Sequence, residues 1–427
     1  AFILTAAMLT TLAAPAFADT WCIENGNITV KAGDTEGTNK VSQGSIIDRE
    51  DTNTIITNSD KDTASSNTVT IDAGNDKVEV TLDNVNIKAG SGSALTSKGD
   101  VTLTLKGDNH LTGGISDTGN YGRNGIASTG SLTISGGSTV TANGGNGGNV
   151  SGDGISSNGS VTISGGTVKA AGGDSKDGYG GDGIRSGGGV TISGNTVNAA
   201  GGNGGKVGGY GICSFDRVAI SGGTVEAAGG NGSTGGGSGI YSSVIDLSGS
   251  LELTAKAGSP TGKALLQNGR ELDLDTIKDK LGPGAKVTTT DANGETKEVS
   301  IPLPVEPEKP VIPEESSSSS DGGSATPSAP ASPLPGLTVT DKDGQRISYT
   351  STQSGNTLTV CVGRFTASLR ASLSALRQLR AEGIETITFQ TILCSTTLSV
   401  DELLAMGGED AEAVLTHRST DSSLTVG

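Results

Sequence analysis

The chain has 427 residues, of which 69 are glycine and only 3% are aromatic, and its formal net charge is −17. It contains too few large apolar residues for a conventional globular core, whereas a solenoid needs only a few aliphatic side chains per coil. The acidic balance and the lack of a basic stripe exclude nucleic acid as a partner.

Residues 1–18, AFILTAAMLTTLAAPAFA, predict an export signal. The apolar run ends in Ala16-Phe17-Ala18, a small-residue pattern that precedes signal-peptide cleavage. A transmembrane anchor is the alternative, but its length is marginal. We expect the N-terminus to be incomplete, because it has no initiator Met and no basic region. The mature protein is then secreted or on the cell surface, without a transmembrane segment.

Residues 19–66 are polar and acidic with short apolar bursts. We interpret them as an N-terminal cap and irregular first coils, because the open sheet edge at the end of a solenoid needs covering.

A repeated unit dominates residues 67–258. It reads GISSNGSVTISGG from Gly154, and its copies start at Gly125, Gly183, Gly211 and Gly239, a spacing of 28 or 29 residues. Within the unit, Val161/Ile163 and Val168/Ala170 alternate with polar residues, as half-buried strands do. Glycine-containing turns separate the strands. The pattern predicts an all-β solenoid, a right-handed parallel β-helix of about 28-residue coils with three short strands each.

The repeat gives way to other segments after residue 258. Residues 259–300 predict a C-terminal cap with a short helix within 272–281 and a hairpin at Asn293-Gly294. Residues 301–336 form a Pro/Ser-rich linker. Residues 337–427 predict a small α+β domain that we expect to be cut short at Gly427. Its helix carries the apolar stripe Leu369, Leu373, Leu376 and Leu379. Cys361 and Cys394 fall on matching strand faces, and a disulfide between them is geometrically plausible.

Stacking of coils turns each loop position into a column. One column contains Asn146, Asp174, Asn203 and Asn231. Stacked amide side chains form hydrogen-bonded ladders, so we expect a structural ladder, with ligand contacts as the alternative.

A second column runs through Asn124, Asp153 and Asp182, with Asp174 and Asp177 nearby. Adjacent carboxylates repel one another unless they are solvated or bridged. Asp153, Asp174, Asp177 and Asp182 are therefore candidate calcium ligands, with solvated loop carboxylates as the plainer interpretation.

A third column runs through Tyr121, Val150, Tyr179 and Val207. It predicts either an apolar seam between the loops or a platform on which sugar rings stack. Tyr210 lies off this column, and we expect it to be exposed. The candidate ligand-binding residues are therefore Tyr121, Asp153, Tyr179, Asp182 and Tyr210. Cys213 is expected to face outward, at the position of Ala127, Ser156 and Arg185 in other copies.

No catalytic constellation is evident. The two histidines, His110 and His417, lie in different modules, and no Ser-His-Asp or Cys-His arrangement is present. We expect the protein not to be an enzyme, with a polysaccharide lyase or hydrolase as the least favoured alternative.

Two stretches resemble a known family. GISSNGSVTISGGTVKAAGG and VTLDNVNIKAGSGSALTSKGDVTLTLKGDNHLTGG are similar to secreted bacterial β-helix proteins of the carbohydrate-binding-domain type. The resemblance covers roughly residues 67–258. It implies a right-handed β-helix, an extracellular location, binding of acidic polysaccharide and, in some members, calcium. No individual binding residue carries over. The leading hypothesis is polysaccharide or cell-surface glycan binding through the loop edge. The alternative is a structural surface protein or adhesin with a host or bacterial surface protein as its partner.

Overall fold

In the computed structural model, the described residues are 19–303 and 336–426, apart from gaps at 342–343, 355, 363, 365, 392–394, 407–410 and 418–421. They form two units, one on each side of residues 304–335. The predicted signal peptide and nearly all of the predicted linker lie outside the described residues.

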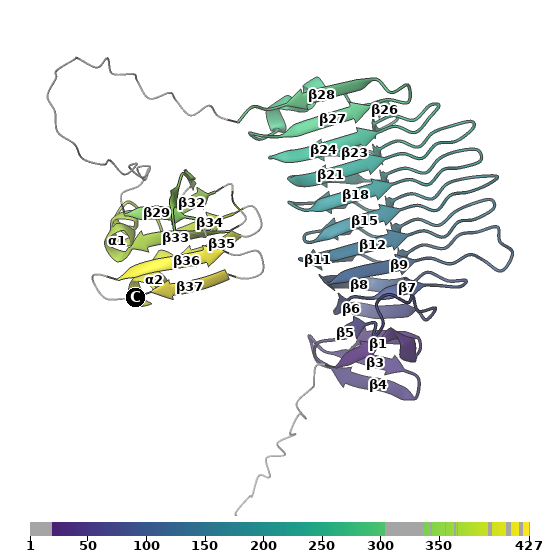
Figure 1. The fold of residues 1–427 in the computed structure, drawn as a ribbon, viewed down its shortest axis with the longest axis horizontal. Coiled ribbons are helices and arrows are strands. Elements are labelled where there is room, and N and C mark those ends of the chain that lie inside the picture. Colours follow the sequence, from purple (N-terminus) through teal and green to yellow (C-terminus); the bar gives the residue numbers. More distant parts are fainter. Residues whose placement is uncertain are drawn as a thin grey trace, which may run out of the picture. The chain divides into compact units, whose positions relative to one another are not determined.

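The first unit is a parallel β-helix, which confirms the fold class (Figure 1). One coil consists of β13 (Ile155–Ser157), β14 (Val161–Ile163) and β15 (Thr167–Ala171). Each strand pairs in parallel with the strand one coil on, so that Ile155 lies opposite Ile184 and Val161 opposite Val190. Like side chains therefore stack on like, as the repeat predicts.

The other coils repeat these three positions. First strands are β10 (Ile126–Ser128), β16 (Ile184–Ser186), β19 (Ile212–Ser214), β22 (Ile240–Ser242) and β25 (Leu265–Gln267). Second strands are β11 (Leu132–Gly136), β17 (Val190–Ile192), β20 (Arg217–Ile220) and β23 (Val244–Leu247). Third strands are β9 (Asp108–Thr112), β12 (Thr139–Asn143), β18 (Thr196–Ala200), β21 (Gly223–Ala228), β24 (Leu251–Lys256) and β27 (Lys286–Thr290). Nearer the N-terminus lie β6 (Val69–Asp83), β7 (Asn86–Lys88) and β8 (Leu95–Lys106).

The core of the solenoid is a stack of aliphatic side chains. Ile155, Val161, Ile163 and Val168 are all fully buried. Burying one such side chain stabilises the fold by roughly 1.5–3 kcal/mol, so only a stack of coils offsets the loss of chain entropy. Gly166 turns the chain between the second and third strands with a φ of 73°, a conformation that favours glycine.

Both ends of the solenoid are covered. At the N-terminal end lie β1 (Thr20–Cys22), η1 (Ile23–Asn25), β2 (Ile28–Ala32), β3 (Asn39–Gln43), β4 (Ile46–Asp51) and β5 (Ile55–Thr57). There β2 pairs in parallel with β6 and antiparallel with β3. At the other end, β28 (Thr296–Ser300) pairs antiparallel with β27, which itself pairs in parallel with β24. Parallel pairing thus extends beyond residues 67–258 in both directions.

The C-terminal cap contains β26 (Arg270–Glu271) and the 3₁₀ helix η2 (Leu274–Lys280). The side chain of Asp273 caps this helix by accepting from the backbone N–H of Asp275. The sequence predicts a helix here, and the structure shortens and tightens it.

Among its described residues, the second unit contains two sheets and two helices. Its elements are β29 (Leu337–Thr340), β30 (Arg346–Ile347), β31 (Thr350–Ser354), β32 (Thr357–Cys361), β33 (Ala367–Ser372), α1 (Leu373–Ala381), β34 (Thr386–Gln390), β35 (Ser395–Ser399), α2 (Val400–Met406), β36 (Glu412–His417) and β37 (Ser422–Val426).

The structure corrects the predicted start of the helix and leaves the predicted disulfide untested. Leu369 lies in β33 rather than in the helix, because Ser372 caps α1 and makes Leu373 its first residue. Cys361 ends β32, where Sγ lies 3.5 Å from Oε1 of Gln390. The proposed disulfide lies outside the described residues, because Cys394 does.

Candidate functional site

Between the third strand of one coil and the first strand of the next, the chain leaves the solenoid in a long glycine-rich loop, which we call an arm. Five successive arms span residues 113–125, 144–154, 172–183, 201–211 and 229–239. They lie side by side along one edge of the solenoid (Figure 1). Each arm has an outward leg, which follows the third strand, and a return leg, which leads to the Gly-Ile of the next coil.

Backbone hydrogen bonds between glycines join the arms. The N–H of Gly181 donates to the carbonyl of Gly173 in the same arm at 2.9 Å, and the N–H of Gly202 in the next arm donates to Gly181 at 2.8 Å. In the same way, the N–H of Gly209 donates to the carbonyl of Gly202, and the N–H of Gly230 donates to the carbonyl of Gly209. A side chain on Gly181 would collide with the carbonyl oxygen of Gly152 in the preceding arm. Glycine is required here by close approach, and the arms form one hydrogen-bonded slab.

The outward legs carry the column Asn146, Asp174, Asn203 and Asn231. Each Oδ1 accepts the backbone N–H one coil on, at 2.9 Å from Asn146 to Asp174, 2.6 Å from Asp174 to Asn203 and 2.9 Å from Asn203 to Asn231. Asn231 continues the series to the N–H of Ser259. The ladder therefore runs from side chain to backbone, and its four residues are exposed.

The return legs carry the column Tyr121, Val150, Tyr179 and Val207, which we call the tyrosine column. Parallel bridges join each member to the next. Tyr121 is 52% exposed, Val150 40% and Tyr179 54%. Of the two roles that the sequence leaves open, a closed seam does not account for side chains that keep about half their surface in solvent.

Near the solenoid, the return legs carry a second ladder, which we call the base ladder. Oδ1 of Asn124 accepts the N–H of Asp153 at 2.8 Å, Oδ1 of Asp153 that of Asp182 at 2.8 Å, and Oδ1 of Asp182 that of Tyr210 at 2.7 Å. Asp182 is only 5% exposed, and its Oδ2 lies 2.9 Å from a guanidinium nitrogen of Arg185. The carboxylates of Asp153 and Asp182 thus accept backbone hydrogen bonds from the next coil.

The base ladder is electrostatically unusual. Burial, and then the neighbouring carboxyl of Asp153, raise the pKa of Asp182 to about 7, while the N–H of Tyr210 and Arg185 act in the opposite direction. Burial also raises the pKa of Asp153. A raised carboxyl pKa is a property of general acids in glycoside hydrolysis. Here, however, both oxygens of Asp182 are already engaged within the protein.

The four candidate calcium ligands occupy three places. Asp153 and Asp182 belong to the base ladder, whereas Asp174 lies on an outward leg and Asp177 at an arm tip, both exposed. Among the described residues, no group of three or more His, Cys, Asp or Glu side chains gathers where it could hold a metal ion.

Sequence reasoning missed a cluster beside the base ladder. The rings of Tyr210 and Tyr241 stack with centroids 5.1 Å apart, and Arg185 lies 5.0 Å over the ring of Phe215. Cys213 pairs with Arg185 on one side and Tyr241 on the other. Its position lies outside the core cluster, but its neighbours leave the thiol only 1% exposed, and burial raises its pKa. Tyr210 is half-buried rather than fully exposed.

The aromatic residues share one property. Between residues 95 and 258 they are Tyr121, Tyr179, Tyr210, Phe215 and Tyr241. None is among the buried residues of the solenoid core. Aligning the coils by columns would have shown this from the sequence, because all five fall on arm, turn or outward-facing strand positions.

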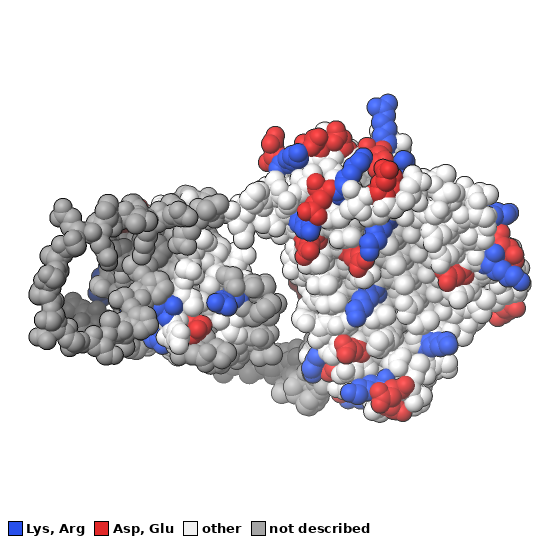
Figure 2. Space-filling model, turned by 45° about the horizontal axis from the view of Figure 1, so that its top comes forward, with Lys and Arg blue, Asp and Glu red and all other residues white. Residues whose placement is uncertain are grey.

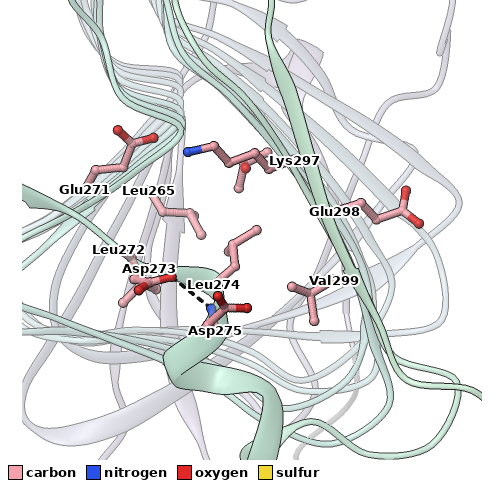
Figure 3. A pocket seen from close by; sticks show the side chains of 10 residues that line it. Leu265, Glu271, Leu272, Asp273, Leu274, Asp275, Lys297, Glu298 and Val299 are labelled. Carbon is pink, nitrogen blue, oxygen red and sulfur yellow. Dashed lines mark hydrogen bonds between the residues drawn. The ribbon is translucent and has the colours of Figure 1, made fainter.

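A pocket lies in the C-terminal cap (Figure 3). It has a volume of about 530 Å³, and Leu265, Leu274 and Val299 line it together with the acidic side chains around η2. Two of these are already paired, Glu271 with Lys263 at 3.3 Å and Asp275 with Lys278 at 2.6 Å. The pocket therefore gives weaker grounds for a ligand site than the arms do.

The face in Figure 2 shows acidic and basic side chains interspersed over the described residues, without a continuous basic surface. Within the described ranges, no helix combines the length and apolar character needed to cross a membrane. Comparison with protein-family models, curated proteins and solved structures gives no match.

Proposed function

We propose that this protein is a secreted or cell-surface bacterial protein that binds polysaccharide through the tyrosine column on the return legs of its arms. The observation that carries the proposal is the alignment of Tyr121 and Tyr179 in one bridged column, each about half exposed. Tyrosine rings present flat apolar faces to sugar rings and hydroxyl groups to sugar hydroxyls.

The spacing of the column supports a repeating ligand. Tyr121 and Tyr179 are two coils apart, which places them roughly 10 Å from each other along the stack. Val150 lies between them and offers an apolar contact at the intermediate coil. A glycan lying along the stack would therefore meet a side chain of the column at every coil.

The arms are also preorganised. Their legs are joined by backbone hydrogen bonds from Gly145 to Gly258, so little chain entropy remains to be lost on binding. Binding that needs no ordering of loops retains more of the contact energy as affinity. This favours a ligand that binds the arms as they stand.

A glycan array probed with the full chain tests the proposal, with and without calcium. The variant Tyr121→Ala/Tyr179→Ala should lose roughly tenfold or more in affinity, since one aromatic contact contributes about 0.5–1.5 kcal/mol. Phe215→Ala is the matched control, because Phe215 is 51% exposed but lies outside the tyrosine column. If no glycan binds in either condition, the proposal fails, and capture of a bacterial or host surface protein by the same arms would favour the adhesin alternative.

A further inference from the structure

Four of the aromatic side chains outside the core lie in adjoining columns. Tyr121 and Tyr179 belong to the tyrosine column. Tyr210 ends the base ladder, three residues nearer the solenoid and one coil beyond Tyr179. Tyr241 follows Cys213 in the next column and stacks on Tyr210. The four tyrosines thus occupy a diagonal that crosses five successive coils, about 19 Å along the stack.

These columns face the same side of the arms. A side chain on Gly180 would collide with the outward leg at the carbonyl of Gly202, and one on Gly181 with Gly152 along the stack. Tyr179, which precedes these two glycines, is 54% exposed, so its ring points away from both neighbouring legs. Asp182 contacts both the backbone of Tyr210 and the side chain of Arg185. The base ladder therefore adjoins the strand column of Arg185, which also contains Tyr241.

The face offers hydrogen-bonding groups but little free charge. No hydroxyl of the four tyrosines has a hydrogen-bond partner among the described residues, including the half-buried Tyr210 and Tyr241. Stacking covers one face of each ring in the Tyr210–Tyr241 pair. The charges beside it are used internally, because Arg185 pairs with Asp182 and stacks on Phe215.

We propose that the four tyrosines form one track along the solenoid for an extended, linear, uncharged glycan, rather than for a short or acidic oligosaccharide. This inference rests on the proposed function and specifies its substrate class. The track runs along the stack, so each further sugar unit gains contacts with a further coil. Tyr179 contacts chains of any length, whereas Tyr210 and Tyr241 contact only chains long enough to pass the base ladder.

Calorimetry on the full chain with cello-oligosaccharides, from dimer to octamer, tests the track, and oligogalacturonates of the same lengths serve as the charged counterpart. Affinity for the cello-oligosaccharides should rise at least tenfold from dimer to octamer. Tyr241→Ala should remove most of that rise, and Tyr179→Ala should weaken every length. Tyr241→Phe, which keeps the ring and removes the hydroxyl, separates the hydrogen bond from the stack and guards against misfolding of the alanine variant.

The outcomes decide between the two proposals. Equal affinity for short and long chains, a Tyr241→Ala variant that behaves as wild type, or preference for oligogalacturonates would overturn the track. Failure of both series to bind would also overturn it. In each of these cases, polysaccharide binding on the array that depends on Tyr121 and Tyr179 would leave the proposed function standing.

Discussion

Oδ1 of Asp153 accepts the backbone N–H of Asp182 at 2.8 Å, which fixes a half-buried and a buried carboxyl group one coil apart. One guanidinium, that of Arg185, contacts Asp182. Ionising both carboxyl groups beside a single cation costs free energy in this poorly solvated site. The pair therefore holds a proton at pH values where exposed carboxyls have lost theirs. Protonation of the base ladder therefore makes the stability of the arms depend on pH.

The first prediction concerns that dependence. The pKa of Asp182 is about 7 in the folded protein against an ordinary 3.8, so the folded state keeps a proton that the unfolded chain releases. The contribution of this proton to the free energy of unfolding should be greatest below about pH 4 and fall as pH rises to about 7, by at most about 1.4 kcal/mol per pH unit. Asp182→Asn should flatten the profile, because the amide oxygen still accepts from Tyr210. Urea titrations across this pH range measure it.

The control is Asp174→Asn, which makes the same exchange in the exposed outward-leg ladder. If both variants change the profile equally, or if Asp182→Asn unfolds more readily at pH 8 than wild type, the account of the base ladder is wrong.

A second prediction concerns close approach of the arms. Gly181→Ala should destabilise the protein by about 1–3 kcal/mol, because the new methyl group overlaps the carbonyl of Gly152. Gly137→Ala is the control, since a Cβ there meets nothing within 4 Å. Thermal unfolding of both variants compares them. Equal melting temperatures would contradict a glycine requirement set by packing.

Metal removal gives a third prediction. Oδ1 of Asp153 and both oxygens of Asp182 already accept or pair within the protein, whereas Asp174 and Asp177 lie elsewhere on the arm. Chelation with EDTA should therefore leave the unfolding temperature unchanged. A rise in that temperature with added calcium, absent in Asp182→Asn, would instead support a calcium site at the base ladder.

Cysteine accessibility gives a fourth prediction. Cys213 is 1% exposed and its pKa is raised by burial, so its reactive thiolate is scarce. Cys22, which is half-buried, should react with a maleimide much faster. Peptide mapping by mass spectrometry after timed labelling measures the two rates. Labelling of Cys213 at the rate of Cys22 would show that the cover formed by its neighbours opens in solution.

The repeat pattern by itself determined the solenoid. Val161 and Ile163 alternate with polar residues and recur at a constant interval, and every copy must bury the same side chains against the next. This arrangement is local in each strand and is repeated from coil to coil. The register therefore followed from sequence alone, as did the positions of the arms and the two columns that became ladders.

Tertiary structure decided which outward-facing residues stay accessible. Tyr179 is open, whereas Asp182 and Cys213 are buried, although the sequence places all three outside the core. The difference arises because exposure at such a position depends on neighbours about 28 residues away. Arg185 and Tyr241 flank Cys213 only once the coils are stacked, and the glycine legs set which way each side chain points. The period of the sequence determined the columns, and the packing of the arms determined what each column can do.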